Sequence, residues 1–320
     1  MLNLSDLRAQ ALALVSQIAE RGSAELHYLQ KMISSGAFGL EPPQNYAALV
    51  ADIRRWGEVG MIPALNARRT PHRTALIDDE GSMTFRELDE ASHAVANGLL
   101  AMGVKGGDGV AILARNHRWF LIANYAAARV GARTILLNTE FSGPQIRDVA
   151  AREGGKVIIY DDEYTDAVKL AEAPLGKLRA LGSNPDTNTP SGSTDETLAE
   201  LIARSSKAPA PKATKRSSII ILTSGTTGTP KGANRHAPPT LAPIGGVLSH
   251  VPFKANEVTS LPSPMFHALG YLHATIAMTL GSTLVLHRRF RPQTVLEDVA
   301  KHNVTAIVVV PVMLSRMIDA

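Results

Sequence analysis

An apolar run passes directly into a hydroxyl-rich loop in the stretch IIILTSGTTGTPKG, residues 219–232. The run at 219–222 has the continuous apolar character of a buried strand. A polyphosphate needs close backbone approach, hydrogen-bond donors and a compensating cation, all of which this loop supplies. The residues expected to bind phosphate are Thr223, Ser224, Gly225, Thr226, Thr227, Gly228 and Lys231.

The spacing in this loop differs from that of a Walker A loop, in which Gly-x-x-x-x-Gly-Lys-Ser/Thr opens a helix. Gly228 lies three residues before Lys231, and Pro230 intervenes. A kinase or P-loop ATPase is therefore disfavoured. A flexible turn without a ligand is the alternative for a loop of this composition.

Short apolar runs alternate with helical patterns along most of the chain. Strands are expected at 74–77, 109–113, 132–137, 156–160, 218–222, 257–261, 283–286 and 305–310, and helices at 84–102, 119–130, 145–153 and 292–302. This alternation predicts an α/β fold of stacked, largely parallel sheets covered by helices. The run 305–310 is expected to be buried on both faces, with a helix beginning at 311.

Four segments are expected along the chain: a helical N-terminal extension at 1–60, a first α/β subdomain at 61–181, a flexible linker or loop at 182–217, and the start of a second α/β subdomain at 218–320. In the extension, apolar residues at helical spacing, from Leu7 to Ile18 and from Leu26 to Ile33, predict two amphipathic helices. Packing on the main body is favoured over a membrane-surface role, because the polar face is not strongly basic. The linker is expected to carry a short helix at 196–204 and a solvated basic tether.

Composition narrows the classes of function. The 320 residues carry a net charge of +4 without one basic block, and only 5% are aromatic, which disfavours nucleic-acid binding. Cysteine is absent, which excludes disulfides and thiolate chemistry and fits a cytoplasmic protein. No apolar run approaches the roughly 20 residues of a membrane-spanning helix, so any membrane contact should be peripheral. The spacing of the histidines predicts no metal site.

The order Thr-Ser-Gly-Thr-Thr-Gly-x-Pro-Lys-Gly at 223–232 resembles the phosphate-binding signature of the adenylate-forming superfamily at every position. That superfamily includes acyl-CoA synthetases, luciferases and peptide-synthetase adenylation domains. Residues 83–88, 107–112 and 131–138 resemble further family segments, so the similarity covers most of residues 60–320. The resemblance implies the N-terminal domain of an AMP-forming acyl-CoA synthetase of the fatty-acid–CoA ligase type, truncated at the C-terminus.

A second element, SPMFHALG at residues 263–270, is similar to the family's Pro-(Leu/Met)-Phe-His-x-x-Gly segment. By resemblance, Lys231 and His267 have catalytic roles, and Phe266, His267 and Gly270 border the substrate pocket. The alternative is that His267 has no catalytic role and makes its hydrogen bonds within its own loop. The family's Ser/Thr-His pair after the phosphate loop is replaced by Asn234-Arg235-His236, so no role is carried to His236.

The resemblance implies ATP-dependent conversion of a carboxylic acid, favoured to be a fatty acid, to an acyl-adenylate and then to acyl-CoA. ATP, Mg²⁺ and coenzyme A are the implied cofactors and co-substrates. The family's Thr-Glu pair, ribose-binding aspartate, hinge and C-terminal catalytic lysine have no counterpart in these residues, so an inactive N-terminal fragment is expected. The alternatives are a non-catalytic nucleotide-binding protein, half of a split enzyme completed by another chain, and an adenylating enzyme with a different substrate.

Overall fold

The computed structural model describes residues 22–37, 43–181, 183–184, 189–190, 192–223, 231–235 and 241–320. The chain forms two compact units. The smaller unit combines Met1–Leu40 with Ala237–Ala255, and the larger combines Glu41–His236 with Asn256–Ala320. The helix predicted between Leu7 and Ile18 lies outside the described residues.

In the smaller unit, a helix covering residues 22–35 packs against α9 (Ala242–His250). A Cβ atom built on Gly245 would lie 2.3 Å from the Cβ of Tyr28, so only glycine allows this approach of the two helices. Met32 is buried, whereas Leu26 and Ile33 are exposed. The predicted apolar stripe is therefore covered only in part.

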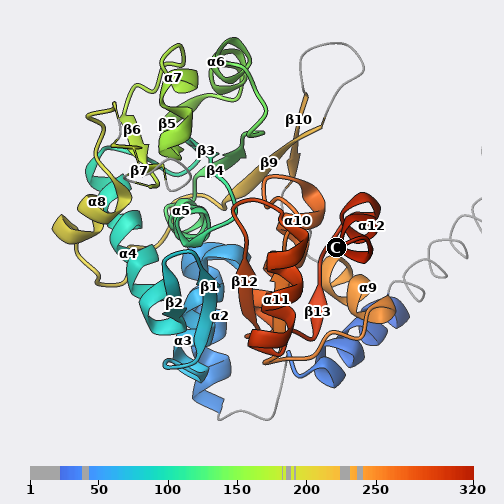
Figure 1. The fold of residues 1–320 in the computed structure, drawn as a ribbon. Coiled ribbons are helices and arrows are strands. Elements are labelled where there is room, and N and C mark those ends of the chain that lie inside the picture. Colours follow the sequence, from blue (N-terminus) through green and yellow to red (C-terminus); the bar gives the residue numbers. More distant parts are fainter. Residues whose placement is uncertain are drawn as a thin grey trace, which may run out of the picture. The chain divides into compact units, whose positions relative to one another are not determined.

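The larger unit contains two main sheets in its described part (Figure 1). A six-stranded sheet has the order β10-β9-β4-β3-β5-β6, and a five-stranded sheet has the order β13-β11-β12-β1-β2. All their pairings are parallel except those of β9 with β10 and β1 with β2. The predicted α/β fold with largely parallel sheets is confirmed.

The strands of the six-stranded sheet are β3 (Gly109–Leu113), β4 (Arg133–Leu136), β5 (Gly155–Tyr160), β6 (Gly176–Arg179), β9 (Ser218–Thr223) and β10 (Lys231–Arg235). Those of the five-stranded sheet are β1 (Thr74–Asp78), β2 (Gly81–Thr84), β11 (Val258–Leu261), β12 (Thr283–Leu286) and β13 (Ala306–Ile307). A small antiparallel pair is formed by β7 (Ser183–Asn184) and β8 (Thr189–Pro190).

The helices of the larger unit are α2 (Pro43–Gly60), α3 (Ile62–Arg69), α4 (Phe85–Ala101), α5 (Arg118–Arg129), α6 (Gly143–Arg152), α7 (Thr165–Val168), α8 (Leu198–Arg204), α10 (Ala268–Thr279), α11 (Pro292–His302) and α12 (Pro311–Ile318). Helix α4 begins where the sequence predicts, because Thr84 and Glu87 form a capping box: the N–H of Glu87 donates to the Thr84 hydroxyl at 3.2 Å, and the N–H of Thr84 donates to the Glu87 carboxylate at 2.7 Å. None of the described helices has the length and apolar character needed to span a bilayer.

Both faces of the six-stranded sheet are covered by apolar packing. Val110 and Ile112 of β3 belong to a core that includes residues of α4 and α5, whereas Ala111 and Leu113 belong to a second core with residues of α6. Successive side chains of a strand point to opposite faces, so a strand covered on both sides is apolar throughout. This explains the uninterrupted apolar runs in the sequence.

Each sheet combines strands from before and after the predicted linker. β1 pairs with β12, and β4 pairs with β9. The predicted subdomain boundaries stay a prediction. Within the linker, the short helix is α8, and residues 206–213 are held by hydrogen bonds: Asn97 donates to the carbonyl of Ala208 at 2.9 Å, and the indole of Trp56 donates to that of Ala210 at 3.0 Å.

The prediction of a doubly buried strand at 305–310 is wrong in extent and burial. β13 is limited to Ala306–Ile307, and among the described residues it pairs only with β11, at the edge of its sheet, which leaves Ile307 37% exposed. An edge strand has a hydrogen-bonded neighbour on one side only. The apolar residues that flank Ala306–Ile307 are not part of the strand, although the sequence predicted that they would be. The helix predicted from residue 311 is confirmed as α12.

Candidate functional site

The hairpin of β9 and β10 brings the two ends of the phosphate-binding signature together. In the antiparallel register, Thr223 stands opposite Lys231, and Leu222 stands opposite Gly232. Ser224, Gly225, Thr226, Thr227 and Gly228 lie outside the described residues, as does His236. The seven-residue connection thus begins and ends at one point on the sheet, and it leads into a strand rather than into the helix that a Walker A loop opens.

The second predicted element lies between β11 and α10. His267 is the residue before the first turn of α10, and its N–H donates to the carbonyl of Pro264 at 3.2 Å. The rings of Phe266 and His267 are 4.4 Å apart at an interplanar angle of 50°. Partial burial lowers the pKa of His267 by desolvation, so the imidazole is neutral at pH 7 and offers one donor and one acceptor.

Gly270 allows the first turn of α10 to pack tightly against the preceding loop. A Cβ atom built on Gly270 would lie 2.2 Å from the carbonyl oxygen of Pro264 and 2.8 Å from that of Ser263. No side chain fits at that separation, so glycine is required for the loop to fold back in this way. Phe266, His267 and Gly270 are therefore brought together by the structure as one compact turn.

Asn116 anchors this turn to the other sheet, and the sequence analysis did not identify it. Its amide nitrogen donates to the carbonyls of Leu261 and Ser263 at 2.9 and 2.8 Å, and its amide oxygen accepts from the N–H of Met265 at 2.8 Å. Asn116 follows β3, which is two positions from β9 in the sheet. With strands about 4.8 Å apart, the carboxyl ends of β3 and β9 are separated by roughly 10 Å. The His267 turn is thus tied to the same sheet edge at which the phosphate loop starts.

A network of charged side chains, most of them buried, lies beyond the carboxyl ends of β3, β5 and β12. His117 Nε2 lies 2.8 Å from an Asp161 carboxylate oxygen, and both side chains are almost fully buried. Glu163 accepts hydrogen bonds from three arginines at 2.8 to 3.0 Å, namely Arg115, Arg288 and Arg289. Arg288 and Arg289 follow β12, so Glu163 connects the two sheets.

This network also escaped the sequence analysis. The position of these residues in the sequence could have identified the network. Arg115, Asp161 and Arg288 each follow a buried strand within two residues, and α/β proteins bind their ligands at the edge of the sheet where such strands end. In the described ranges, no three acidic or histidine side chains converge in a metal-binding arrangement.

The sequence comparisons agree with this architecture. A model of the AMP-binding enzyme family matches residues 64–320. A feruloyl-CoA synthase of Amycolatopsis sp is 31% identical over 263 residues, covering 80% of this chain and 49% of that protein. A long-chain-fatty-acid–CoA ligase of Mycobacterium tuberculosis is 27% identical over 237 residues, covering 73% of this chain and 46% of that protein. The chain spans about half the length of these curated relatives.

Solved structures show the same fold. The N-terminal domain of FACL13 from Mycobacterium tuberculosis superimposes with a TM-score of 0.68 at 24% identity, covering 82% of this chain and 65% of that one. The o-succinylbenzoate-CoA synthetase of Bacillus subtilis, with its acyl-adenylate intermediate, gives a TM-score of 0.64 at 25% identity, covering 81% of this chain and 63% of that one. Because the family model matches residues 64–320, the chain belongs to the AMP-binding enzymes, and its homologues are acyl-CoA ligases.

Proposed function

We propose that this chain takes part in the ATP-dependent activation of a carboxylic acid, with the loop between β9 and β10 binding the polyphosphate of ATP. The observation that carries the proposal is the register of Thr223 against Lys231, which closes the hydroxyl- and glycine-rich connection at the carboxyl end of β9. Lys231 then supplies positive charge beside N–H and hydroxyl donors from the loop.

In the proposed reaction, a carboxylate oxygen bonds to the α-phosphorus of ATP, and the bond from that phosphorus to the pyrophosphate oxygen breaks. The thiol of coenzyme A then attacks the acyl carbon and AMP leaves. Lys231 offsets charge on the departing pyrophosphate, and Mg²⁺ bound to ATP would spread the same charge. His267 offers a neutral polar contact, and Phe266 shields the reacting carboxylate from water.

We propose a fatty acid as the substrate. The named relatives differ in their substrates, which are ferulate and a long-chain fatty acid by their names. The motivation from this chain is the SPMFHALG turn, where Phe266 and Met265 are buried among apolar side chains and His267 is the exposed polar member. We place the reaction in the cytoplasm, with any membrane contact peripheral.

A further protein segment, on the same or on a separate chain, is proposed to complete the active site. On α12, Val312, Leu314 and Ile318 are 57%, 49% and 76% exposed. Large apolar side chains gathered on one short helix indicate a surface that another segment covers. The aligned part of this chain covers about half of each named relative, so the proposed segment corresponds to their C-terminal part.

The purified chain should bind ATP with magnesium yet release no pyrophosphate and form no thioester when fatty acids of graded length and coenzyme A are added. Each missing group that stabilises the transition state costs a factor of about 100 to 1,000, and several are missing together. Addition of the C-terminal half of a related ligase should restore pyrophosphate release, with fatty acids preferred over ferulate. Turnover by the chain alone would contradict the fragment proposal, and failure to bind ATP would contradict the proposed function itself.

A further inference from the structure

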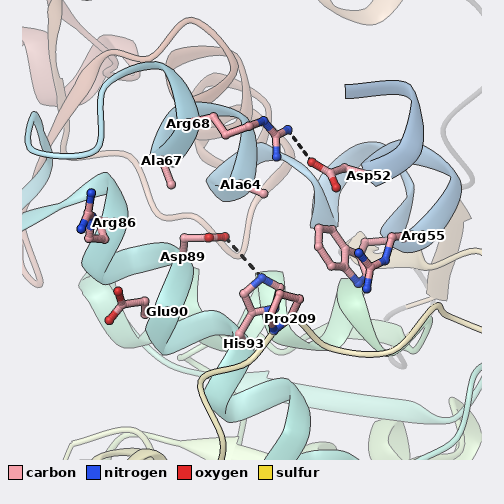
Figure 2. Close-up of a pocket in the computed structure, with 11 residues that line it drawn as sticks. Asp52, Arg55, Ala64, Ala67, Arg68, Arg86, Asp89, Glu90, His93 and Pro209 are labelled. Atoms are coloured by element: carbon pink, nitrogen blue, oxygen red, sulfur yellow. Dashed lines mark hydrogen bonds and ion pairs between the residues drawn. The ribbon is translucent and has the colours of Figure 1, made fainter. Parts of the chain in front are cut away.

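A pocket in the larger unit lies among α2, α3, α4 and the segment around Pro209 (Figure 2). It is an open cavity of about 390 Å³. Its lining includes Arg55, Arg86 and His93, and no described residue of the phosphate-binding signature or of the SPMFHALG turn contributes to it. The reaction proposed above therefore gives this pocket no role.

His93 presents an unused donor to the pocket. Its ring is 4% exposed, and its Nδ1 accepts the N–H of Ala210 at 3.1 Å, which places the proton of the neutral ring on Nε2. Nε2 lies 3.7 Å from an Asp89 oxygen, which is too long for a hydrogen bond, and makes no closer one within the described ranges. Burial and the nearby charges of Arg129 and Arg55 lower the pKa of His93 to about 3, so the ring stays neutral.

The acidic groups of the pocket already have cationic partners. Arg68 donates to Asp52, and the buried Arg129 donates to Asp89. Glu90 lies 3.6 Å from Lys207. Each of the three carboxylates is therefore paired with one cationic side chain, and none remains to pair with a positively charged ligand.

Two guanidinium groups remain without a carboxylate. Arg55 lies over the ring of Trp56 at 4.8 Å, and no ion pair joins either Arg55 or Arg86 to an acidic residue in the described part of the chain. Figure 2 shows Arg86 and Arg55 on opposite sides of the pocket, with His93 between them in that view. The stack on Trp56 limits the motion of Arg55 and leaves its N–H donors available.

We propose that this pocket binds a small organic dianion of the dicarboxylate or phosphomonoester class. The Nε2–H of His93 donates to one anionic oxygen, and Arg55 and Arg86 neutralise the two charges from opposite sides. Ala64 and Ala67 of the lining face the carbon atoms that join the anionic groups. The ligand is expected to be short, because the two guanidinium groups bound a single cavity.

Calorimetric titration of the intact chain with succinate and with glycerol 3-phosphate tests this proposal and distinguishes the two ligand classes. At least one of these anions should bind, whereas the uncharged succinamide and glycerol should not. Arg55→Gln and Arg86→Gln should each weaken binding about tenfold, the loss expected for one charge-assisted hydrogen bond. Both side chains are exposed, so the variants should fold normally.

Two control variants distinguish binding in this pocket from a general effect of positive charge and from binding at the ATP loop. Arg54→Gln removes the same charge from the same helix outside the pocket, and Lys231→Ala removes the cation of the phosphate loop. Both variants should bind the dianion as the unaltered chain does. The proposal is overturned if neither anion binds, if Arg54→Gln weakens binding as much as Arg55→Gln, or if Lys231→Ala abolishes it.

Discussion

The amide oxygen of Asn116 accepts the backbone N–H of Met265 at 2.8 Å across 149 positions of sequence. The amide nitrogen of the same side chain donates to two carbonyls of the same loop. One buried side chain therefore fixes the turn that carries His267 to the end of β3, and with it the spacing between the two predicted site elements.

Replacing Asn116 by alanine should remove the hydrogen bonds that hold this turn against the end of β3. Three hydrogen bonds are lost, and a buried N–H and two carbonyls are left unsatisfied, so the free energy of unfolding should fall by about 2 to 4 kcal/mol. Urea titration measures the change. Asn138→Ala, which removes one exposed acceptor of the Glu140 N–H, should cost less than about 1 kcal/mol. Equal losses in the two variants would contradict the anchoring role of Asn116.

Gly270→Ala should disturb the same turn by steric overlap. Because the added Cβ would meet the carbonyl of Pro264 at 2.2 Å, backbone must move, and a loss of about 1 to 3 kcal/mol in the free energy of unfolding is expected. Gly246→Ala is the matched control, because no atom lies within 4 Å of its added Cβ and alanine favours the helix. Thermal melts should show a lower melting temperature for the first variant only. Similar melting temperatures would mean that the turn is loosely packed.

Sequence reasoning identified the elements that depend on local pattern. The strands at 109–113 and 283–286 and the start of α4 at Thr84 were predicted because the apolar pattern of each element lies within its own few residues. It could not identify Asn116 or Glu163, because most of their partners are more than 100 positions away in sequence and are brought close by the order of the strands in the sheets. The pairing of β1 with β12 was missed for the same reason, since nothing in either strand encodes its neighbour.

Glu163 should contribute to stability through the three arginines that donate to it. Glu163→Gln removes the charge that these guanidinium groups share in a mostly buried setting, so a loss of about 3 kcal/mol in the free energy of unfolding is expected. Asp148→Asn, which breaks an exposed pair with Arg147, should change stability by less than about 1 kcal/mol. Chemical denaturation of the two variants decides the matter, and a near-neutral Glu163→Gln would show that the network contributes little.

Burial of neutral His93 should make folding sensitive to acid. The pKa of His93 is lowered to about 3 in the folded chain from 6.5, so its contribution to stability is complete above pH 6.5 and is lost as the pH falls from there toward 3. Between pH 7.5 and pH 5, this should remove about 2 kcal/mol. In His93→Asn, which cannot titrate, the fall in the free energy of unfolding over that range should be smaller by the same amount. An NMR titration in which the His93 ring protonates near pH 6.5 would refute this assignment.

The most direct test of the proposed function is the binding of ATP, with magnesium, to the chain and to its Lys231→Ala variant. Lys231 stands at the closing end of the phosphate-binding connection, opposite Thr223, and its replacement removes the only cation of that loop. Isothermal titration should show ATP affinity about 10- to 100-fold weaker in Lys231→Ala, and unchanged in Lys301→Ala, which removes an exposed lysine of α11. Equal ATP affinity of the chain and its Lys231→Ala variant would contradict the assignment of this hairpin as the phosphate-binding site.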